Sequence, residues 1–323
     1  MLRQPLAGRA DDTFAAGDDH KPPRARQPLR QLLAAMRRSW QAYALLSPIF
    51  VLLIVFVYYP PVLGLYRSFF DWRLGQEPVF VGLQNFQTYA SLPESGREIK
   101  NVGILLLFSL LTQVLMPFVM AELIFAVRSK SLKELYRFIV VIPTLVPGVI
   151  YVLLWRHIYD PNLGPLNALL DALGLHSFSR NWLGDADTAL LAIIGVGFPW
   201  VAGVGTLIFL GGLANISDSV LDACLLDGCQ GLKRLRLIDV PLVLPQIRLL
   251  TVLASIAALT TFEGVLVMTK GGPGYATSVP GLRMFERAFT TGQFGLASSI
   301  GLILFVFALI LTFVVNRLTR SKV

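Results

Sequence analysis

The sequence predicts an all-α membrane protein that crosses the bilayer six times. Hydrophobic residues make up 54% of the 323-residue chain, charged residues make up only 15%, and the mean hydropathy is +0.64. Six apolar runs are each long enough to cross a hydrocarbon core of roughly 30 Å as a helix rising about 1.5 Å per residue. We expect these spans near residues 43–65, 102–127, 138–158, 189–213, 249–268 and 294–315.

Two segments precede the first span. Residues 1–27 are rich in Pro, Arg, Asp and Gly, have no apolar period, and are predicted to be a disordered cytoplasmic tail. Residues 28–41 repeat apolar residues at helical spacing beside arginines, which predicts a basic helix lying on the inner membrane surface. Basic flanking sequence without a helix is the alternative. The transmembrane domain then occupies residues 42–318.

Prolines interrupt two of the expected spans. Pro117 falls inside the second, and Pro143 and Pro147 fall inside the third. A proline removes a backbone donor, which a spanning helix tolerates where it packs against neighbours or lines a cavity. These breaks would have no purpose in a membrane scaffold that moves nothing, so they favour a transport protein.

Lys and Arg are distributed unequally between the two sides of the predicted bundle. Nineteen of the 28 fall in the N-terminal tail, the loops on its side and the C-terminus, and nine fall on the other side. The excess places both termini and the loop at 214–245 on the cytoplasmic side of the plasma (inner) membrane. The net charge of +8 therefore reflects topology and does not indicate a nucleic-acid partner.

The polar loop at 214–245 lies between the fourth and fifth spans and is predicted to form two short helices. Ser217 or Asp218 can cap the first helix, and Gly228 can take the positive φ that ends it. Cys224 and Cys229 lie five residues apart, on different sides of a helix, and are expected to be small reduced core residues without a disulfide or a metal site.

The second helix of the loop is predicted from apolar residues at helical spacing. Leu232, Leu235 and Ile238 should line it, while Lys233, Arg234 and Arg236 stay in water. Two short helices joined at a glycine on one side of a bilayer form a protruding surface on which a partner can dock.

This loop resembles the cytoplasmic coupling loop, or EAA loop, of ABC importer permeases. That loop carries Glu-Ala-Ala, three further residues, Asp-Gly-Ala, and then a spaced Ile and Leu-Pro. Here Asp222-Ala223-Cys224 and Asp227-Gly228-Cys229 stand for the two triplets, and Ile238 and Pro241 match the tail. The departures keep the charge sign or the small size, except for Leu235, where Phe is usual.

Motifs elsewhere are similar to those of the carbohydrate-type permeases, the maltose and glycerol-phosphate importer group. They include Gly82-Leu83-Gln84-Asn85-Phe86 in the first outer loop, Trp155-Arg156 in the third span, and Gly271-Gly272-Pro273 after the fifth. The resemblance covers nearly everything after residue 43. It implies alternating access, with a second permease subunit, two cytoplasmic ATPase subunits and an extracytoplasmic solute-binding protein as partners. The solute it implies is a sugar or a polyol phosphate.

The residues also exclude chemistry within this chain. No Gly-Lys pair occurs anywhere, so a Walker A site is absent and the chain itself needs no cofactor; partner subunits would use the ATP. The three histidines lie far apart and no nucleophile has a nearby base, so we expect neither an enzyme nor a metal site. A secondary transporter or channel working without an ATPase is the alternative. It would have to use intramembrane groups, mainly Glu122 and Glu263, and Glu122 is expected to reach the inner surface.

Four residues are candidates for the substrate path. Glu263 lies about 15 residues beyond Arg248, or roughly 22 Å along a continuous helix, where a carboxylate facing lipid would be costly. Phe262 precedes it, as in the Phe-Asp pair of similar permeases. Trp155 or Trp200 could offer a ring face to a sugar. The alternative for Glu263 is a structural hydrogen bond to a neighbouring helix.

Overall fold

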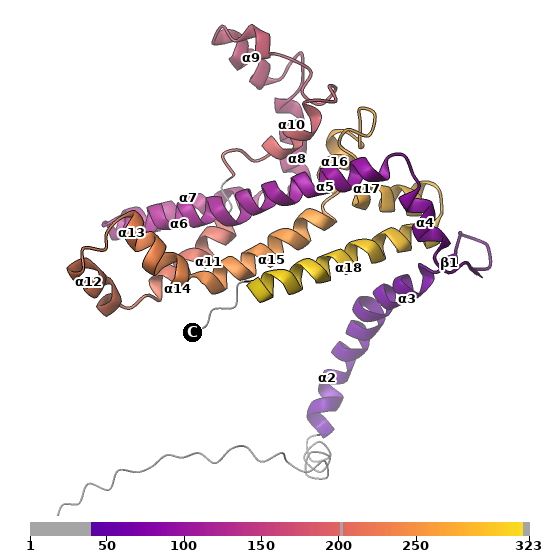
Figure 1. The fold of residues 1–323 in the computed structure, drawn as a ribbon, viewed down its shortest axis with the longest axis horizontal. Helices are drawn as coiled ribbons and strands as arrows, with labels where there is room; N and C mark the ends of the chain where they lie inside the picture. The colour runs from indigo at the N-terminus through magenta and orange to yellow at the C-terminus, as the bar shows by residue number, and fades with distance from the viewer. Residues whose placement is uncertain (1–39, 201–202, 319–323) are drawn as a thin grey trace, which may run out of the picture. The chain divides into compact units, whose positions relative to one another are not determined.

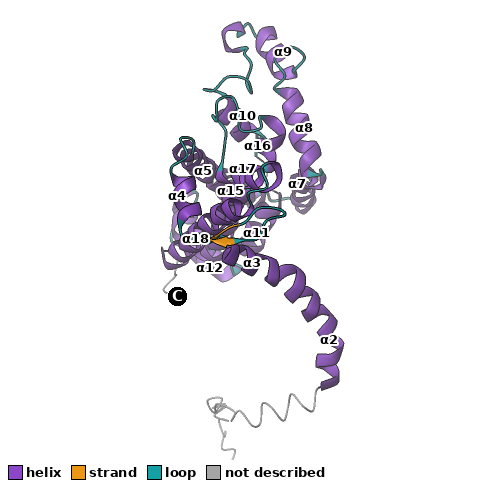
Figure 2. Ribbon diagram, turned by 90° about the vertical axis from the view of Figure 1, so that its right-hand side faces the viewer, coloured by secondary structure: helices purple, strands orange, loops and turns teal. Residues whose placement is uncertain are grey.

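A computed structural model describes residues 40–200 and 203–318, so the predicted tail at 1–27 and all but the end of the predicted basic helix at 28–41 lie outside the described residues. The described chain is almost wholly helical, with one pair of two-residue strands (Figure 2). This confirms the predicted fold class.

The chain divides into two compact units, Met1–Pro60 and Pro61–Val323. The first unit contains α2 (Trp40–Leu53) and a π-helical turn (Ile54–Tyr58). The helix continues as α3 (Tyr59–Arg67), so the first candidate span is a 28-residue helix, Trp40–Arg67. It contains the predicted span at 43–65.

Three further candidate spans lie in the second unit. They are Ser95–Ala126, Leu244–Met268 and Phe294–Leu318. The first consists of α5 (Ser95–Leu110), a π turn (Leu111–Leu115) and α6 (Met116–Ala126); the second of α15 (Leu244–Thr260) and α16 (Glu263–Met268); the third is α18 (Phe294–Leu318). α15 packs against both α5 and α18, and the three run side by side in Figure 1.

The third expected span is bent where the prolines fall. α7 (Lys130–Val141) ends in a 3-10 turn (Ile142–Leu145), and α8 (Gly148–Ile158) follows at 88° to it. Pro143 lies in that turn and Pro147 is the N-cap of α8, where a missing backbone donor costs nothing. The two prolines thus occupy the joint between two helices.

The fourth expected span, 189–213, is divided between α10 (Ala189–Gly195) and α11 (Gly203–Ala214), and residues 201–202 lie outside the described chain. α11 packs against α6 and α7, and a Cβ at Gly203 would collide with the carbonyl oxygen of Val140. The described residues hold four candidate spans, and up to six if each of two bent helix pairs is counted as one. The second such pair is α11 with α12 (Asp218–Leu226), at 74°.

The second unit also contains several short elements. They are β1 (Phe70–Asp71) paired antiparallel with β2 (Val79–Phe80), α4 (Gln84–Ala90), α9 (Pro165–Ala172) with a 3-10 turn (His176–Phe178), and α17 (Pro280–Phe285) with a π turn (Glu286–Thr290). In Figure 1, α4 and α17 lie at the opposite end of the long helices from α12. The predicted outer segments and the polar loop are therefore separated by the length of the bundle.

A buried ion cluster ties α4 and α5 to α17. Arg283 donates from Nε to Glu98 Oε1 at 2.8 Å, and its Nη2 approaches Glu98 at 2.8 Å and Glu94 at 3.1 Å without the alignment of a hydrogen bond. Ser278 and Tyr89 donate to the same Glu98 carboxylate, which is fully buried. Burial alone would lower the pKa of Arg283, but the carboxylates beside it raise the pKa overall.

Candidate functional site

The polar loop is a pair of short helices, as expected, and its first helix is α12. Ser217 occupies the N-cap position with extended backbone, but its side chain makes no capping hydrogen bond. Its hydroxyl instead lies 3.0 Å from the hydroxyl of Ser219. The predicted position of the helix start is correct, and the predicted capping hydrogen bond is absent.

The end of α12 is a Schellman motif centred on Gly228. Gly228 has φ +65°, its N–H donates to Leu225 O at 3.2 Å, and the Cys229 N–H donates to Cys224 O at 2.8 Å. The Cys224 thiol also donates to Cys229 O at 2.8 Å, and both cysteines are buried free thiols. The expectation that they lie on different sides of a helix is wrong, because the helix ends between them and the chain folds back.

The second helix of the loop comprises α13 (Leu232–Arg234), a π turn (Leu235–Asp239) and α14 (Val240–Leu242). Leu235 and Ile238 face inward as predicted, but Leu232 is 82% exposed. Arg234 does not stay in water: it pairs with the buried Asp239 at 3.0 Å and its guanidinium lies 5.3 Å from the centre of a phenylalanine ring on α6. The buried carboxylate of Asp239 would be costly without an opposite charge, which explains why Arg234 lies against it.

Glu122 on α6 lies in the same region, close to Asp239 and Arg234 of the polar loop. It is only partly exposed, one of its carboxylate oxygens is buried without a hydrogen-bond partner, and it interacts electrostatically with Asp239 and Arg234. The junction between the polar loop and α6 is therefore charged as well as apolar.

The polar loop shares a hydrophobic core with the candidate spans. Phe118 and Ile124 of α6 pack in one cluster with Phe209 and Leu213 of α11. Four loop residues pack against this cluster, namely Leu221, Leu235, Ile238 and Val240. The loop, α6 and α11 therefore belong to one close-packed core.

The polar loop is also hollowed between its two helices. A recess of about 430 Å³ lies between α12 and the second helix, and five of the eight predicted coupling residues line it: Ala223, Cys224, Asp227, Cys229 and Ile238. The other three, Asp222, Gly228 and Pro241, are exposed outside its lining. Leu226, at 89% exposed, stands at the end of α12. The recess is lined mainly by apolar side chains, together with one acidic residue, Asp227, and one basic residue, Lys233.

A second cavity, of about 370 Å³, lies among α5, α8, α10 and α15–α16. Two of the four substrate-path candidates, Glu263 and Trp200, line it. Trp155 instead packs with Tyr159, at 5.5 Å between ring centres, and Phe262 stacks on Phe285 at 5.3 Å. Neither of these two belongs to the cavity wall.

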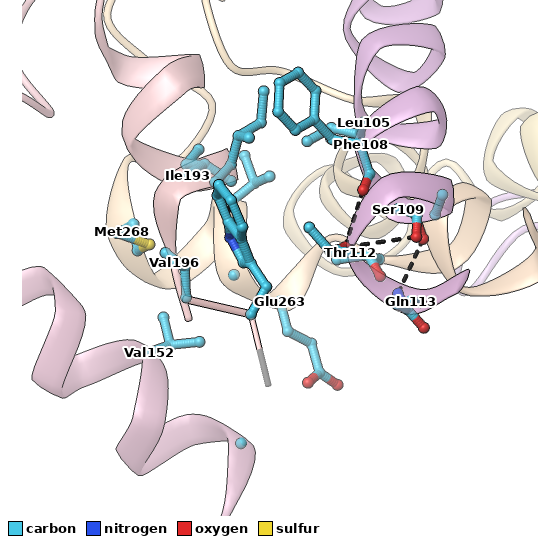
Figure 3. A pocket seen from close by; sticks show the side chains of 17 residues that line it. Leu105, Phe108, Ser109, Thr112, Gln113, Val152, Ile193, Val196, Glu263 and Met268 are labelled. Carbon is cyan, nitrogen blue, oxygen red and sulfur yellow. Dashed lines mark hydrogen bonds between the residues drawn. The ribbon is translucent and has the colours of Figure 1, made fainter. Parts of the chain in front are cut away.

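Three polar side chains that sequence reasoning missed form one wall of this cavity. Gln113 Nε2 donates to Ser109 Oγ at 2.9 Å, and Ser109 Oγ donates to the backbone of α15 at 3.0 Å. Thr112 lies beside this pair, and its hydroxyl donates to Phe108 O at 2.9 Å (Figure 3). Thr112 and Gln113 lie in the π turn between α5 and α6, a type of distortion that is frequent at functional sites. The signal in the sequence was a cluster of three polar residues in an apolar run just before Pro117.

Glu263 reaches the cavity because the fifth span is not one straight helix. α15 ends at Thr260, Thr261 and Phe262 leave helical geometry, and Glu263 is the first residue of α16. No hydrogen bond or ion pair holds its carboxylate among residues 40–200 and 203–318. The estimate of its depth from a continuous helix therefore does not apply, although the expectation of a cavity-facing carboxylate agrees with its position in the lining.

Trp200 is placed by an unusual backbone. It has φ +55°, rare for a residue with a side chain, its indole N–H donates to Ile194 O at 3.2 Å, and Phe198 packs edge-on against it at 5.1 Å. The indole is thus held against the cavity by one hydrogen bond and one ring contact.

Comparison with known proteins agrees with this geometry. Residues 103–322 match the family described as binding-protein-dependent transport system inner membrane component. The trehalose/maltose transport system permease protein MalF of Thermococcus litoralis is 30% identical, covering 88% of this chain and 96% of that protein. The multiple sugar-binding transport system permease protein MsmF of Streptococcus mutans is 28% identical, covering 88% and 97%. A chain of a bacterial alginate ABC transporter, solved with a periplasmic protein bound to alginate pentasaccharide, superposes with TM-score 0.78 at 25% identity, covering 91% and 100%.

Proposed function

The chain belongs to the family of binding-protein-dependent transport system inner membrane components, the permease subunits of ATP-driven importers, and we propose that its own solute is a sugar. The names of similar permeases support this choice, since they include trehalose/maltose and multiple-sugar systems. The cavity supports it as well, because it combines hydroxyl, amide and carboxylate groups with an indole ring. Small-molecule sites in proteins typically enclose about 300–1,000 Å³, and the cavity falls in that range.

The proposal gives residues 214–245 the role of the ATPase contact. Asp222, Ala223 and Asp227 present the exposed face of α12 to the ATPase, while Gly228 fixes the turn behind it. The single observation that carries this role is the shared core of the loop with α6 and α11. Movement of the docked ATPase would be passed through Leu235 and Ile238 into helices that border the cavity region.

The assembly that we propose contains two ATPase subunits, a second permease and an extracytoplasmic solute-binding protein. This chain has one coupling loop, so a second permease is needed to engage the second ATPase. ATP is bound and hydrolysed by the partner subunits, and the chain itself carries no cofactor and no catalytic site. Both termini and the coupling loop lie in the cytoplasm, and α4, α9 and α17 face the binding protein.

Transport then follows alternating access. The binding protein delivers the sugar to the outer face, ATP-driven closure of the ATPase pair displaces the two coupling loops, and the cavity opens inward. The joints at Pro143 and Pro147 and between α15 and α16 are the places where helices can change direction without losing a long hydrogen-bonded ladder.

The proposal is tested in two stages. A thermal-shift screen of the partner binding protein against a sugar panel identifies the ligand, because binding stabilises the native state by mass action. Uptake of that sugar is then measured in proteoliposomes containing the whole complex. We expect uptake to require both ATP and the binding protein. Uptake that persists without ATP would instead indicate a secondary transporter, and a binding protein stabilised only by non-sugar solutes would contradict the proposed substrate.

A further inference from the structure

We propose that the cavity selects its solute by charge, accepting uncharged or positively charged sugars and rejecting sugar acids and sugar phosphates. This inference rests on the proposed function, since it concerns the cavity that would receive the sugar. The observation that carries it is the balance of charge in the wall. Of the 17 described residues that line the cavity, one is charged, and it is an acid, Glu263.

The carboxylate of Glu263 is available to a ligand. It forms no ion pair with any residue in the described ranges 40–200 and 203–318, and no Lys or Arg belongs to the lining. In the view of Figure 3 its side chain extends between the helix that carries Val152 and the helix that carries Gln113. A bound solute would therefore meet this charge without a cation among the cavity-lining residues of this chain to neutralise it.

The opposite wall provides neutral groups suited to hydroxyls. Ser109, Thr112 and Gln113 come from consecutive turns of one helix, and the amide of Gln113 is oriented by its donation to the Ser109 hydroxyl. That bond leaves the amide carbonyl oxygen of Gln113 to accept from a sugar hydroxyl. A carboxylate such as Glu263 accepts two further hydroxyl hydrogen bonds, so neutral sugar rings suit both walls.

The dimensions of the cavity decide how strongly an acidic sugar is disfavoured. A sphere of 370 Å³ is about 9 Å across. An anionic group anywhere inside the cavity would therefore lie within roughly that distance of the wall that carries Glu263. At an effective dielectric constant of about 20, repulsion between two unit charges at this separation lowers affinity by at least tenfold. A sugar that carries a protonated amine at the same place should bind more tightly by a comparable factor. The alginate importer of similar fold handles an acidic polysaccharide, so the inference separates this chain from it.

The test uses three matched monosaccharides, glucose, glucosamine and glucuronate, whose rings differ by one charged group. The importer complex is purified through a tag on this chain, placed in lipid nanodiscs without its binding protein, and titrated with each sugar by saturation-transfer NMR, which detects weak binding. Empty nanodiscs give the background. The omission of the binding protein matters, because its own selectivity would otherwise mask that of the cavity.

The wild-type complex should bind glucuronate at least tenfold more weakly than glucose, and glucosamine at least as tightly as glucose. Glu263→Gln should bring glucuronate to within about threefold of glucose, whereas Glu263→Asp, which keeps the charge, should preserve the discrimination. Glu77→Gln removes one negative charge from an exposed outer loop and should leave the ratio unchanged. Gln113→Leu should weaken the binding of all three sugars to a similar degree.

Two outcomes overturn the inference in distinguishable ways. Equal affinities for glucose and glucuronate in the wild type, or a ratio that Glu263→Gln does not change, would show that the wall does not select by charge, while sugar binding itself would stand. Failure of every sugar to bind above the empty-nanodisc background would show that this cavity is not a sugar site. That result would also remove the support that the cavity gives to the proposed function.

Discussion

Gly228 is the residue at which a single added methyl group should separate folding of the chain from its coupling to the ATPase. Its φ of +65° is reached at little cost only by glycine, and by asparagine or aspartate to a lesser extent, whereas other residues with a Cβ lose about 1–2 kcal/mol there. A Cβ at Gly228 would meet nothing within 4 Å, so the cost comes from the backbone alone and no collision adds to it.

The magnitude follows from the Schellman motif. If Gly228→Ala keeps the turn, it costs about 1 kcal/mol or slightly more; if the turn opens, it loses two hydrogen bonds, each contributing about 0.5–1.5 kcal/mol net. Gly228→Val adds the restriction of a β-branched side chain, so the native docking surface becomes a minority conformation. Since about 1.4 kcal/mol is a factor of ten, we expect the Val variant to lose uptake by at least tenfold.

The assay is ATP-dependent uptake in membrane vesicles, normalised to the amount of inserted permease, together with the amount of ATPase that co-purifies. Both should fall in the order Gly, Asn, Ala, Val. Gly211→Ala is the matched control, because Gly211 is exposed in the middle of α11 and a Cβ there also meets nothing within 4 Å, so the substitution should be harmless or slightly stabilising. Normal uptake and normal ATPase recovery with Gly228→Val would refute the assignment of the loop.

Two further predictions concern topology and stability. A cysteine placed at Gln84 or Gly174 should react with a membrane-impermeant reagent added outside intact cells, and one at Ser219 should not; all three positions are exposed, so labelling at Ser219 would reverse the orientation. Arg283→Met should cost about 3–5 kcal/mol by leaving Glu98 buried and unpaired, and adding Glu98→Gln should recover part of the lost thermal stability in detergent; equal loss in the single and double variants would contradict an ion-pair origin.

The helix content, the spans and the ends of α12 could be predicted from the sequence because each depends on local signals. An apolar run of about 20 residues is rare in soluble proteins, so it predicts a membrane-spanning helix. A glycine after a capped amphipathic segment is a strong signal for the end of a helix. The same local reasoning failed for Cys224 and Cys229. It treated them as points on one helix, whereas the helix ends at Leu226 and the turn brings the Cys229 carbonyl oxygen to the Cys224 thiol, with both residues buried.

Long-range packing accounts for the rest of the differences. The charge of Arg234 predicted a solvated side chain, but pairing with the buried Asp239 from the same helix outweighs hydration. No proline marks the break of the fifth span at Thr261, and the nearby Gly264 lies inside α16, so a continuous helix was the reasonable prediction. Trp155 and Phe262 are aromatic residues of the right kind for a sugar site, and only the fold shows that other aromatic rings already occupy their faces.

The most direct measurement of the central claim is photo-crosslinking from Asp222, an exposed residue of α12 outside the lining of the recess. A photoreactive amino acid would replace Asp222 in membranes that contain the assembled importer, with the same substitution at Gln84 on the opposite end of the bundle as the control. We expect a crosslinked product between this chain and an ATPase subunit from position 222 and none from position 84. Co-purification of the ATPase with no crosslink from position 222, or with a crosslink from position 84 instead, would contradict it.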